Sequence, residues 1–209
     1  MKVTKFTQKI EYWAAENKIV YNIASCYYKD IIRREAKLAN INNRDHVLCI
    51  GGGPCPFSAI LLHQATGAKI TVIDNIKHCV TVAKQLVTRM GLDDYINVMH
   101  QDGVEVELNN YTVILLALQV SPLESVLENL HKKARPGTRL LIRRPRECLS
   151  KLYSNLSTKW LKDCIAINHK GARNIGNTLL CIKQESFNED KMAILGISRP
   201  HAIVGSIAV

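Results

Sequence analysis

A glycine- and proline-rich turn separates two apolar segments in the first third of the chain. Residues 47–50 are apolar, the sequence Gly51-Gly52-Gly53-Pro54-Cys55-Pro56 follows, and apolar residues at helical spacing begin directly after it. This order predicts a buried strand, a sharp turn and a helix that starts near Pro56. Glycines in such a turn permit positive φ angles and let a bound molecule approach the main chain. The pattern is typical of the first strand and helix of a nucleotide-binding α/β domain.

The two prolines of this turn narrow the class of ligand. Gly51 and Gly53 fit the first two positions of the Gly-x-Gly-x-x-Gly dinucleotide pattern, but Pro56 stands at the third. Backbone N–H groups at a helix N-terminus bind pyrophosphate, and each proline removes one such donor. A ligand with adenine and ribose but no phosphate loses nothing by this. We therefore expect S-adenosylmethionine as the cofactor.

Two acids that follow later strands fit a ligand with an adenosine part. Asp74 ends an apolar segment 23 positions after Gly51, close to the roughly 20 expected for a ribose-binding acid. Asp102 follows the segment 96–100, and we expect it to hold the adenine amino group. The predicted cofactor-binding residues are Ile50, Gly51, Gly52, Gly53, Pro54, Asp74, Asn75, Asp102, Gly103 and Leu118.

The elements that must position these residues alternate along the chain. The predicted strands are 47–50, 70–73, 96–100, 112–118, 138–143, 161–168 and 177–183, and the predicted helices are 56–66, 77–90, 122–133 and about 146–156. Such alternation predicts an α/β fold with a doubly wound, Rossmann-like sheet of seven strands and helices on both faces. A short loop joins the last two strands. We therefore expect a hairpin and an antiparallel last strand, as in class I methyltransferase folds.

The chain divides into three predicted parts. Residues 1–45 form short helices that act as a lid or a dimer contact, residues 46–184 form the S-adenosylmethionine-binding domain, and residues 185–209 form a tail. The helical stretch is too short to be a domain, so its apolar face should pack against the sheet domain or a second subunit, as in a homodimer. The apolar residues at helical spacing are Trp13, Ile19, Ile23, Tyr27, Ile31 and Leu38.

Segments before the first strand often cover the cofactor site in class I folds. That position would bring Tyr27 or Tyr28 close to the transferred group. Tyr28 is the predicted catalytic residue, as the group that orients or deprotonates the acceptor. Packing of its ring in the core, with no catalytic role, is the alternative.

Length and composition limit the class of protein. The 209 residues suffice for one domain, and no segment approaches the roughly 18–20 apolar residues of a membrane span. The N-terminal residues lack the apolar core of a signal peptide. Seven cysteines are an odd number and none are spaced as Cys-x-x-Cys. We therefore expect neither a disulfide framework nor a zinc site, and a cytoplasmic location. No acid cluster predicts a metal.

The net charge of +10 is unevenly distributed. Residues 131–151 contain eight Lys and Arg against one acid, whereas residues 51–130 contain four against eight. A basic concentration attracts phosphate or carboxylate groups and can bind nucleic acid, but no aromatic residues interleave with it. We expect a small-molecule acceptor, anionic or an amine, and do not favour nucleic acid. A solvated surface is the alternative for this run.

Several of these features together resemble the nicotianamine synthase family over about residues 40–184. The family carries Ile-Gly-Gly/Ser-Gly-Pro-x-Pro at its first loop, and most methyltransferases lack both prolines. This chain matches at Val47–Pro56 with Phe57-Ser58, at Asp74 and Asp102, and along Asn177–Lys183. The segment Tyr27-Tyr28-Lys29-Asp30 is similar to the family's Tyr-Tyr-Lys-Asn, with Asp30 in place of asparagine.

The resemblance implies a chemistry different from methyl transfer. Members of this family bind S-adenosylmethionine and transfer its aminobutyrate chain to an amine, and an active-site tyrosine is expected in the Tyr-Tyr segment. The family's catalytic glutamate lies in a longer N-terminal helical domain. In this chain Glu11 or Glu16 would have to take its place.

Other transfer chemistries find less support. The segment after the fourth predicted strand lacks the Asn-Pro-Pro-Tyr signature of amino-methylating enzymes, and Cys55 lies in the cofactor loop, where a packed thiol is expected. A sulfonium already activates the carbon under attack, so catalysis rests mainly on alignment of the acceptor. The sequence favours a transferase that moves the methyl group to a small molecule. Aminobutyrate transfer to an amine and a non-catalytic S-adenosylmethionine-binding subunit of a complex are the alternatives.

Overall fold

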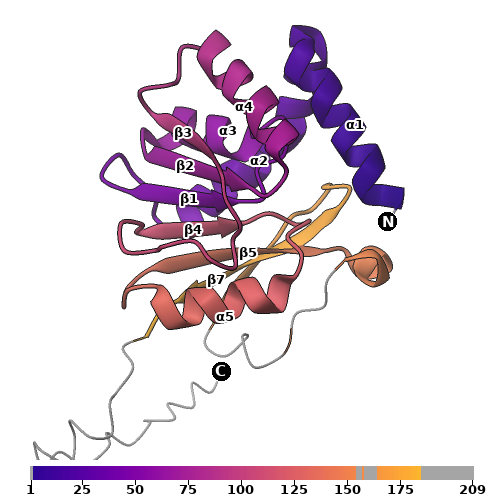
Figure 1. The fold of residues 1–209 in the computed structure, drawn as a ribbon. Helices are drawn as coiled ribbons and strands as arrows, with labels where there is room; N and C mark the ends of the chain where they lie inside the picture. Colours follow the sequence, from indigo (N-terminus) through magenta and orange to yellow (C-terminus); the bar gives the residue numbers. More distant parts are fainter. Residues whose placement is uncertain (1, 154–156, 158–163, 185–209) are drawn as a thin grey trace, which may run out of the picture.

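The computed structural model describes residues 2–153, 157 and 164–184, with side chains from residue 9 on, and shows a seven-stranded mixed sheet (Figure 1). Its order is β3-β2-β1-β4-β5-β7-β6. The first five strands of this order are parallel, and β7 runs antiparallel to both β5 and β6. The predicted Rossmann-like class I methyltransferase sheet is confirmed. The strands are β1 (His46–Ile50), β2 (Lys69–Asp74), β3 (Ile96–His100), β4 (Val113–Leu116), β5 (Arg139–Pro145), β6 (Ile165–Asn168) and β7 (Ile175–Ile182).

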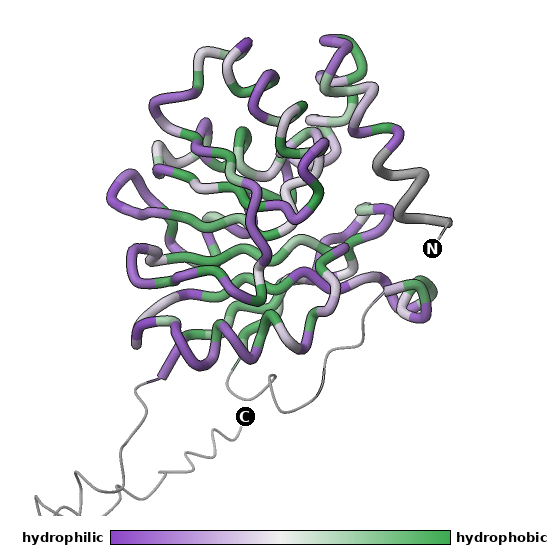
Figure 2. The backbone as a smooth tube through the Cα atoms, viewed as in Figure 1, coloured by the Kyte–Doolittle hydropathy of each residue, from purple (hydrophilic) through white to green (hydrophobic). Residues whose placement is uncertain are grey.

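Helices cover both faces of this sheet. They are α1 (Lys2–Glu16), α2 (Lys18–Leu38), α3 (Phe57–Thr66), α4 (Lys77–Arg89), α5 (Leu123–Lys133) and the 3₁₀ helix η1 (Glu147–Leu152). Alternate residues of β1 enter two cores, with Val47 and Cys49 facing α2, α3 and α4, and Leu48 and Ile50 facing α5. Figure 2 shows the apolar residues concentrated along the strands and on the inner side of α5. The helix expected at 146–156 is only the short η1, and 154–156 lie outside the described residues.

The N-terminal helices pack on the same face as α3 and α4 (Figure 1), but only part of the expected apolar row, Tyr27, Ile31 and Leu38, takes part in the packing. Trp13, Ile19 and Ile23 are 62%, 69% and 70% exposed. The buried side of α2 includes Ile32 and Glu35 beside Ile31, and Glu35 is paired inside the protein with a residue of β5. Hydrophobic periodicity does not reveal this internal ion pair.

A disulfide joins Cys164 to Cys181, which corrects the expectation drawn from cysteine spacing. The β6–β7 hairpin pairs Ile165 with Leu180, so the two cysteines stand opposite one another with their Cα atoms 4.4 Å apart. This pairing depends on strand register, which the 17-residue separation in sequence does not show. The other five cysteines are free thiols.

Two further expectations concern the membrane and the tail. Within the described residues, no helix combines the length and apolar character needed to cross a bilayer. The predicted tail, residues 185–209, lies outside the described part of the chain.

Candidate active site

The glycine-rich loop after β1 lies where the strand order reverses, between β1 and β4. Ligands of doubly wound sheets bind at this position, beyond the carboxyl ends of the strands. Gly51 and Gly53 adopt φ angles of +84° and +64°. The N–H groups of Gly51 and Gly52 donate to the carbonyl oxygen of Ile73 at 2.9 and 3.2 Å, and that of Gly53 donates to Asp74 Oδ2 at 2.8 Å. All three glycine donors are used inside the protein, so they are not directed at a phosphate.

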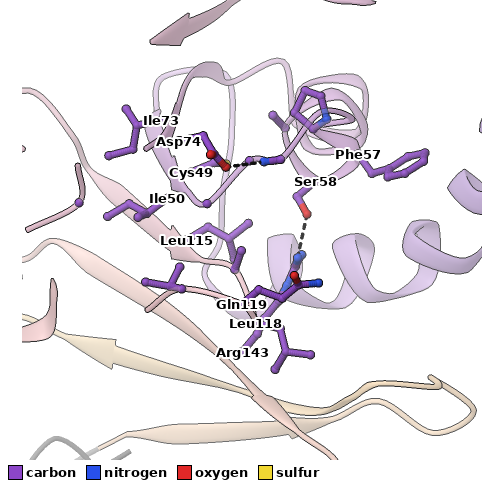
Figure 3. Close-up of a pocket in the computed structure, with 18 of the residues that line it drawn as sticks. Cys49, Ile50, Phe57, Ser58, Ile73, Asp74, Leu115, Leu118, Gln119 and Arg143 are labelled. Carbon is purple, nitrogen blue, oxygen red and sulfur yellow. Dashed lines mark hydrogen bonds between the residues drawn. The ribbon is translucent and has the colours of Figure 1, made fainter. Parts of the chain in front are cut away.

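Asp74 holds the loop as well as facing the pocket (Figure 3). Its Oδ2 accepts the Gly53 hydrogen bond, and its Oδ1 accepts one from the N–H of Ile76 at 2.9 Å. Each carboxylate oxygen carries a second lone pair, so both can accept a further hydrogen bond from a ribose hydroxyl. Asp102 is arranged similarly, with Oδ1 accepting from the N–H of Val104 at 2.9 Å.

One pocket brings together most of the residues predicted to bind the cofactor. Nine of the ten line it, and Pro54 does not. Pro54 is buried in the loop, where it shapes the turn. The nine are Ile50, Gly51, Gly52, Gly53, Asp74, Asn75, Asp102, Gly103 and Leu118. They come from four separate segments, so the fold assembles one site from the positions that the sequence marked.

Tyr27 and Tyr28 both line this pocket but have different surroundings. The ring of Tyr28 stacks on Phe57, with centroids 5.2 Å apart. Burial raises the pKa of the Tyr28 hydroxyl, and the nearby Glu11 carboxylate raises it further, so the group stays protonated. The hydroxyl of Tyr27 instead accepts hydrogen bonds from the N–H groups of Arg173 and Asn174 at 3.0 and 3.2 Å. Tyr27 thus holds the β6–β7 loop, and Tyr28 is the tyrosine whose hydroxyl can form a hydrogen bond with a ligand.

Glu11 also lines the pocket, although the sequence marked it only by analogy with a family glutamate. A Cβ atom added to Gly53 would come within 2.7 Å of Glu11 Oε2, so the carboxylate lies directly over the loop. Burial raises the pKa of Glu11 to about 8, and the charge of Asp74 contributes to the increase. Glu16, the other acid considered, is exposed and does not line the pocket.

Contacts between α1 and α4 hold Glu11 in this place. The ring of Tyr12 stacks on His78 with centroids 5.3 Å apart, and its hydroxyl lies 3.2 Å from Cys79 Sγ. The guanidinium of Arg89 donates to the carbonyl oxygen of Ala15. These partners lie more than 60 residues apart in sequence, so the contacts that place Glu11 arise only in the folded chain, although a lid over the site was expected from residues 1–45.

A buried polar network forms the wall of the pocket next to α2. Arg143 Nε donates to Glu35 Oε1 at 2.8 Å and Nη2 to Oε2 at 2.7 Å, while Nη1 donates to Ser58 Oγ at 2.8 Å. The Thr178 hydroxyl donates to Glu35 Oε1 at 2.7 Å, and His169 Nε2 lies 2.8 Å from Thr178 Oγ1. Sequence reasoning missed this cluster. Its one signal was an arginine directly after Leu140-Leu141-Ile142, inside an otherwise apolar strand.

The basic run of residues 131–151 does not form a single surface. Lys132, Lys133 and Arg135 stand at the end of α5, near the amino end of β5, whereas Arg146 follows the carboxyl end of that strand. Arg143 is buried in the Glu35 pair. These residues therefore do not form a continuous anion-binding patch, because β5 places their charges at opposite ends of the sheet.

No metal centre emerges from the described residues, which contain no group of three or more His, Cys, Asp or Glu side chains that could hold an ion. His78 and His100 make separate local contacts, with the ring of Tyr12 and the carbonyl oxygen of Asn75.

Comparisons with solved structures define the class. A glutamate-to-glutamine variant of MtNAS in complex with S-adenosylmethionine has a TM-score of 0.75 at 19% identity, covering 87% of this chain and 75% of that chain. MtNAS in complex with MTA and tNA gives a TM-score of 0.72 at 21% identity, covering 86% and 72%. An RNA methyltransferase from Salinibacter ruber in complex with S-adenosyl-L-homocysteine gives 0.62 at 19% identity, covering 77% and 95%. The fold is that of the class I S-adenosylmethionine-dependent transferases.

The family follows from the sequence match. The family model described as "Nicotianamine synthase protein" matches residues 26–184, which is most of the chain. The protein belongs to the nicotianamine synthase family, a family of S-adenosylmethionine-dependent transferases. A comparison with curated protein sequences gives no match.

Proposed function

We propose that this protein binds S-adenosylmethionine in the pocket and transfers its aminobutyrate group to the nitrogen of an amine acceptor. The observation that carries this proposal is the position of Glu11, a partly buried carboxylate over the glycine loop with a pKa of about 8. Family membership over residues 26–184 supports the same chemistry. Methyl transfer, which the sequence alone favoured, rests on similarity of fold, and folds of this kind host many reactions.

The residues of the pocket fit this cofactor. Asp74 can accept hydrogen bonds from the ribose hydroxyls and Asp102 from the adenine amino group, because each carboxylate keeps lone pairs that the protein does not use. The glycine loop has its N–H groups occupied, which suits a ligand without phosphate. When bound, S-adenosylmethionine supplies a positively charged sulfur that activates the attached carbon, and loss of the aminobutyrate chain leaves methylthioadenosine.

Two of the three acids that line the pocket lie close together. Glu11 and Asp74 lie close enough that the charge of Asp74 raises the pKa of Glu11. A pair of acids with little solvent favours cationic groups, both a sulfonium and an ammonium. Arg143, on the other side of the pocket, is paired with Glu35.

Glu11 is suited to accept a proton from the acceptor. An amine attacks through its nitrogen lone pair, so an ammonium must first lose a proton. A base works best when its pKa lies near the working pH, and a pKa of about 8 meets that condition. Tyr28, whose hydroxyl stays protonated, is then a hydrogen-bonding group that orients the acceptor rather than the base.

The test is the adenosine product released from S-adenosylmethionine in the presence of a panel of amines and amino acids. We expect methylthioadenosine, and Glu11→Gln should lower its formation by about 10²- to 10⁴-fold at saturating S-adenosylmethionine, the usual contribution of a general base. Glu16→Gln, on the exposed side of the same helix, is the control and should behave as wild type. S-adenosylhomocysteine as the product would contradict the proposal.

A further inference from the structure

The guanidinium of Arg143 stands at the pocket wall with part of its hydrogen-bonding capacity unassigned. It carries five N–H groups, and the hydrogen bonds among the described residues use three of them, two on Glu35 and one on Ser58. Its side chain is 3% exposed. A buried N–H group without a partner costs free energy, so a group that enters the pocket and accepts hydrogen bonds from the other two is favoured.

The orientation of this guanidinium is fixed before any ligand arrives. Glu35 binds it through both carboxylate oxygens and is itself held by the Thr178 hydroxyl. Figure 3 shows the side chain extending from β5 toward Ser58, on the side of the pocket that faces Leu118 and Gln119. A rigid arginine fork of this kind matches the two oxygens of a carboxylate better than a flexible lysine does.

The part of the pocket next to Arg143 differs from the part that fits adenosine. Asp74 ends β2 and Asp102 follows β3, whereas Arg143 belongs to β5, two strands beyond β1 in the sheet. Tyr28 and Asn174 line the same pocket from α2 and from the β6–β7 loop. This side therefore has polar groups suited to the amino-acid part of a ligand rather than to a base or a ribose.

We propose that Arg143 is the carboxylate-binding residue of this pocket, and that a reactant is held there by its carboxylate. The inference rests on the proposed function, in which the donor carries an aminobutyrate group with its own carboxylate and the acceptor is an amine. The carboxylate that Arg143 binds comes from the donor or from an acceptor that is an amino acid. The two sources share one recognition chemistry and can be separated experimentally.

The experiment is calorimetric binding of two matched ligand pairs to the full chain. One pair is S-adenosylhomocysteine and its decarboxylated form, which differ only in the donor-side carboxylate. The other is L-alanine and ethylamine, each titrated with methylthioadenosine saturating the adenosine site. In at least one pair the carboxylate should tighten binding by about 10- to 100-fold, the range of a charge-assisted bidentate contact. The pair that shows the effect identifies the source.

Variants test whether Arg143 causes this preference. Arg143→Lys keeps a positive charge beside Glu35 but removes the fork, and should reduce the preference about tenfold or more. The matched control is Arg139→Lys, because Arg139 lies on the same strand and pairs with Asp45 away from the pocket. Should Arg143→Lys fold poorly, the double variant Glu35→Leu/Arg143→Met replaces the ion pair with apolar side chains, which proteins often tolerate.

Two results would overturn the inference. The first is equal binding of both members of both pairs by the wild-type protein, a result that needs no variant. The second is a preference that persists in Arg143→Lys or in the double variant. Because these measurements require no turnover, they are independent of the reaction test. Release of S-adenosylhomocysteine would refute aminobutyrate transfer and leave the carboxylate preference standing.

Discussion

Glu11 Oε2 lies 2.7 Å from the position that a Cβ atom on Gly53 would take, too close for a side chain there. This contact joins the first helix of the chain to the loop that opens the sheet domain. Both residues line the pocket, so the helix that covers the site also supplies a carboxylate in addition to Asp74 and Asp102. The glycine permits this approach and has a φ angle of +64°, which side chains of other residues rarely adopt.

The first prediction uses a matched pair of glycines. Gly53→Ala should lower the free energy of unfolding and weaken S-adenosylmethionine binding, because its methyl group meets the Glu11 carboxylate. Gly91→Ala is the control, since Gly91 has a φ angle of +65° and nothing within 4 Å of an added Cβ. Both variants share the backbone cost of about 1–2 kcal/mol, so a larger loss for Gly53→Ala in denaturant titrations measures the contact. Equal losses together with unchanged S-adenosylmethionine affinity would contradict this prediction.

The second prediction concerns the pH dependence of stability without ligand. Burial raises the pKa of Glu11 from 4.5 to about 8, so the folded state binds this proton more tightly than the unfolded state. The resulting stabilisation is complete below about pH 4.5 and is lost as the pH rises toward 8. Glu11→Gln should remove this decline, and Glu16→Gln should not. Parallel stability curves for wild type and Glu11→Gln across this pH range would contradict the shift.

The third prediction is the choice of cofactor. S-adenosylmethionine and S-adenosylhomocysteine should bind, and NAD should not, because two prolines and three occupied glycine N–H groups leave the loop poorly suited to pyrophosphate. Asp74→Ala should weaken S-adenosylmethionine binding by about 1.5–3 kcal/mol through lost charge-assisted hydrogen bonds. Calorimetry would measure both effects. Equal affinity in wild type and Asp74→Ala would exclude Asp74 from the site.

The fourth prediction concerns the disulfide. Thiol titration of the unfolded, unreduced protein should detect five free cysteines, and seven after reduction. Cys181→Ser should lower the free energy of unfolding by about 3 kcal/mol, as expected for a loop of this length. Seven reactive thiols before reduction would show that Cys164 and Cys181 are unpaired.

The sheet and the cofactor loop were predictable because their signals are local. Strand β1, the turn after it and Asp74 lie within 30 residues, and hydrophobic periodicity together with glycine and proline positions defines them. Glu11 was harder to place, because its position depends on contacts between α1 and α4 that only the folded chain brings together.

The position of Arg143 shows why the charge pattern of the sequence did not predict which basic residues lie on the surface. In the sequence it belongs to a run of basic residues, which predicted a surface patch. In the fold it pairs with Glu35, which lies 108 residues earlier, and strand alternation turns it inward. Apolar spacing misled in a similar way for Trp13 and Ile19, which are exposed, whereas the charged Glu35 lies on the buried side of α2.

The most direct test of the account follows two isotopic labels in S-adenosylmethionine, one in the methyl group and one in the aminobutyrate carboxyl carbon. After incubation with the protein and the amine panel, the adenosine product and the modified acceptor are separated and analysed by mass spectrometry. We predict that the carboxyl label moves to the acceptor and the methyl label stays in methylthioadenosine. A methyl label on the acceptor, with the carboxyl label retained in S-adenosylhomocysteine, would contradict the central claim.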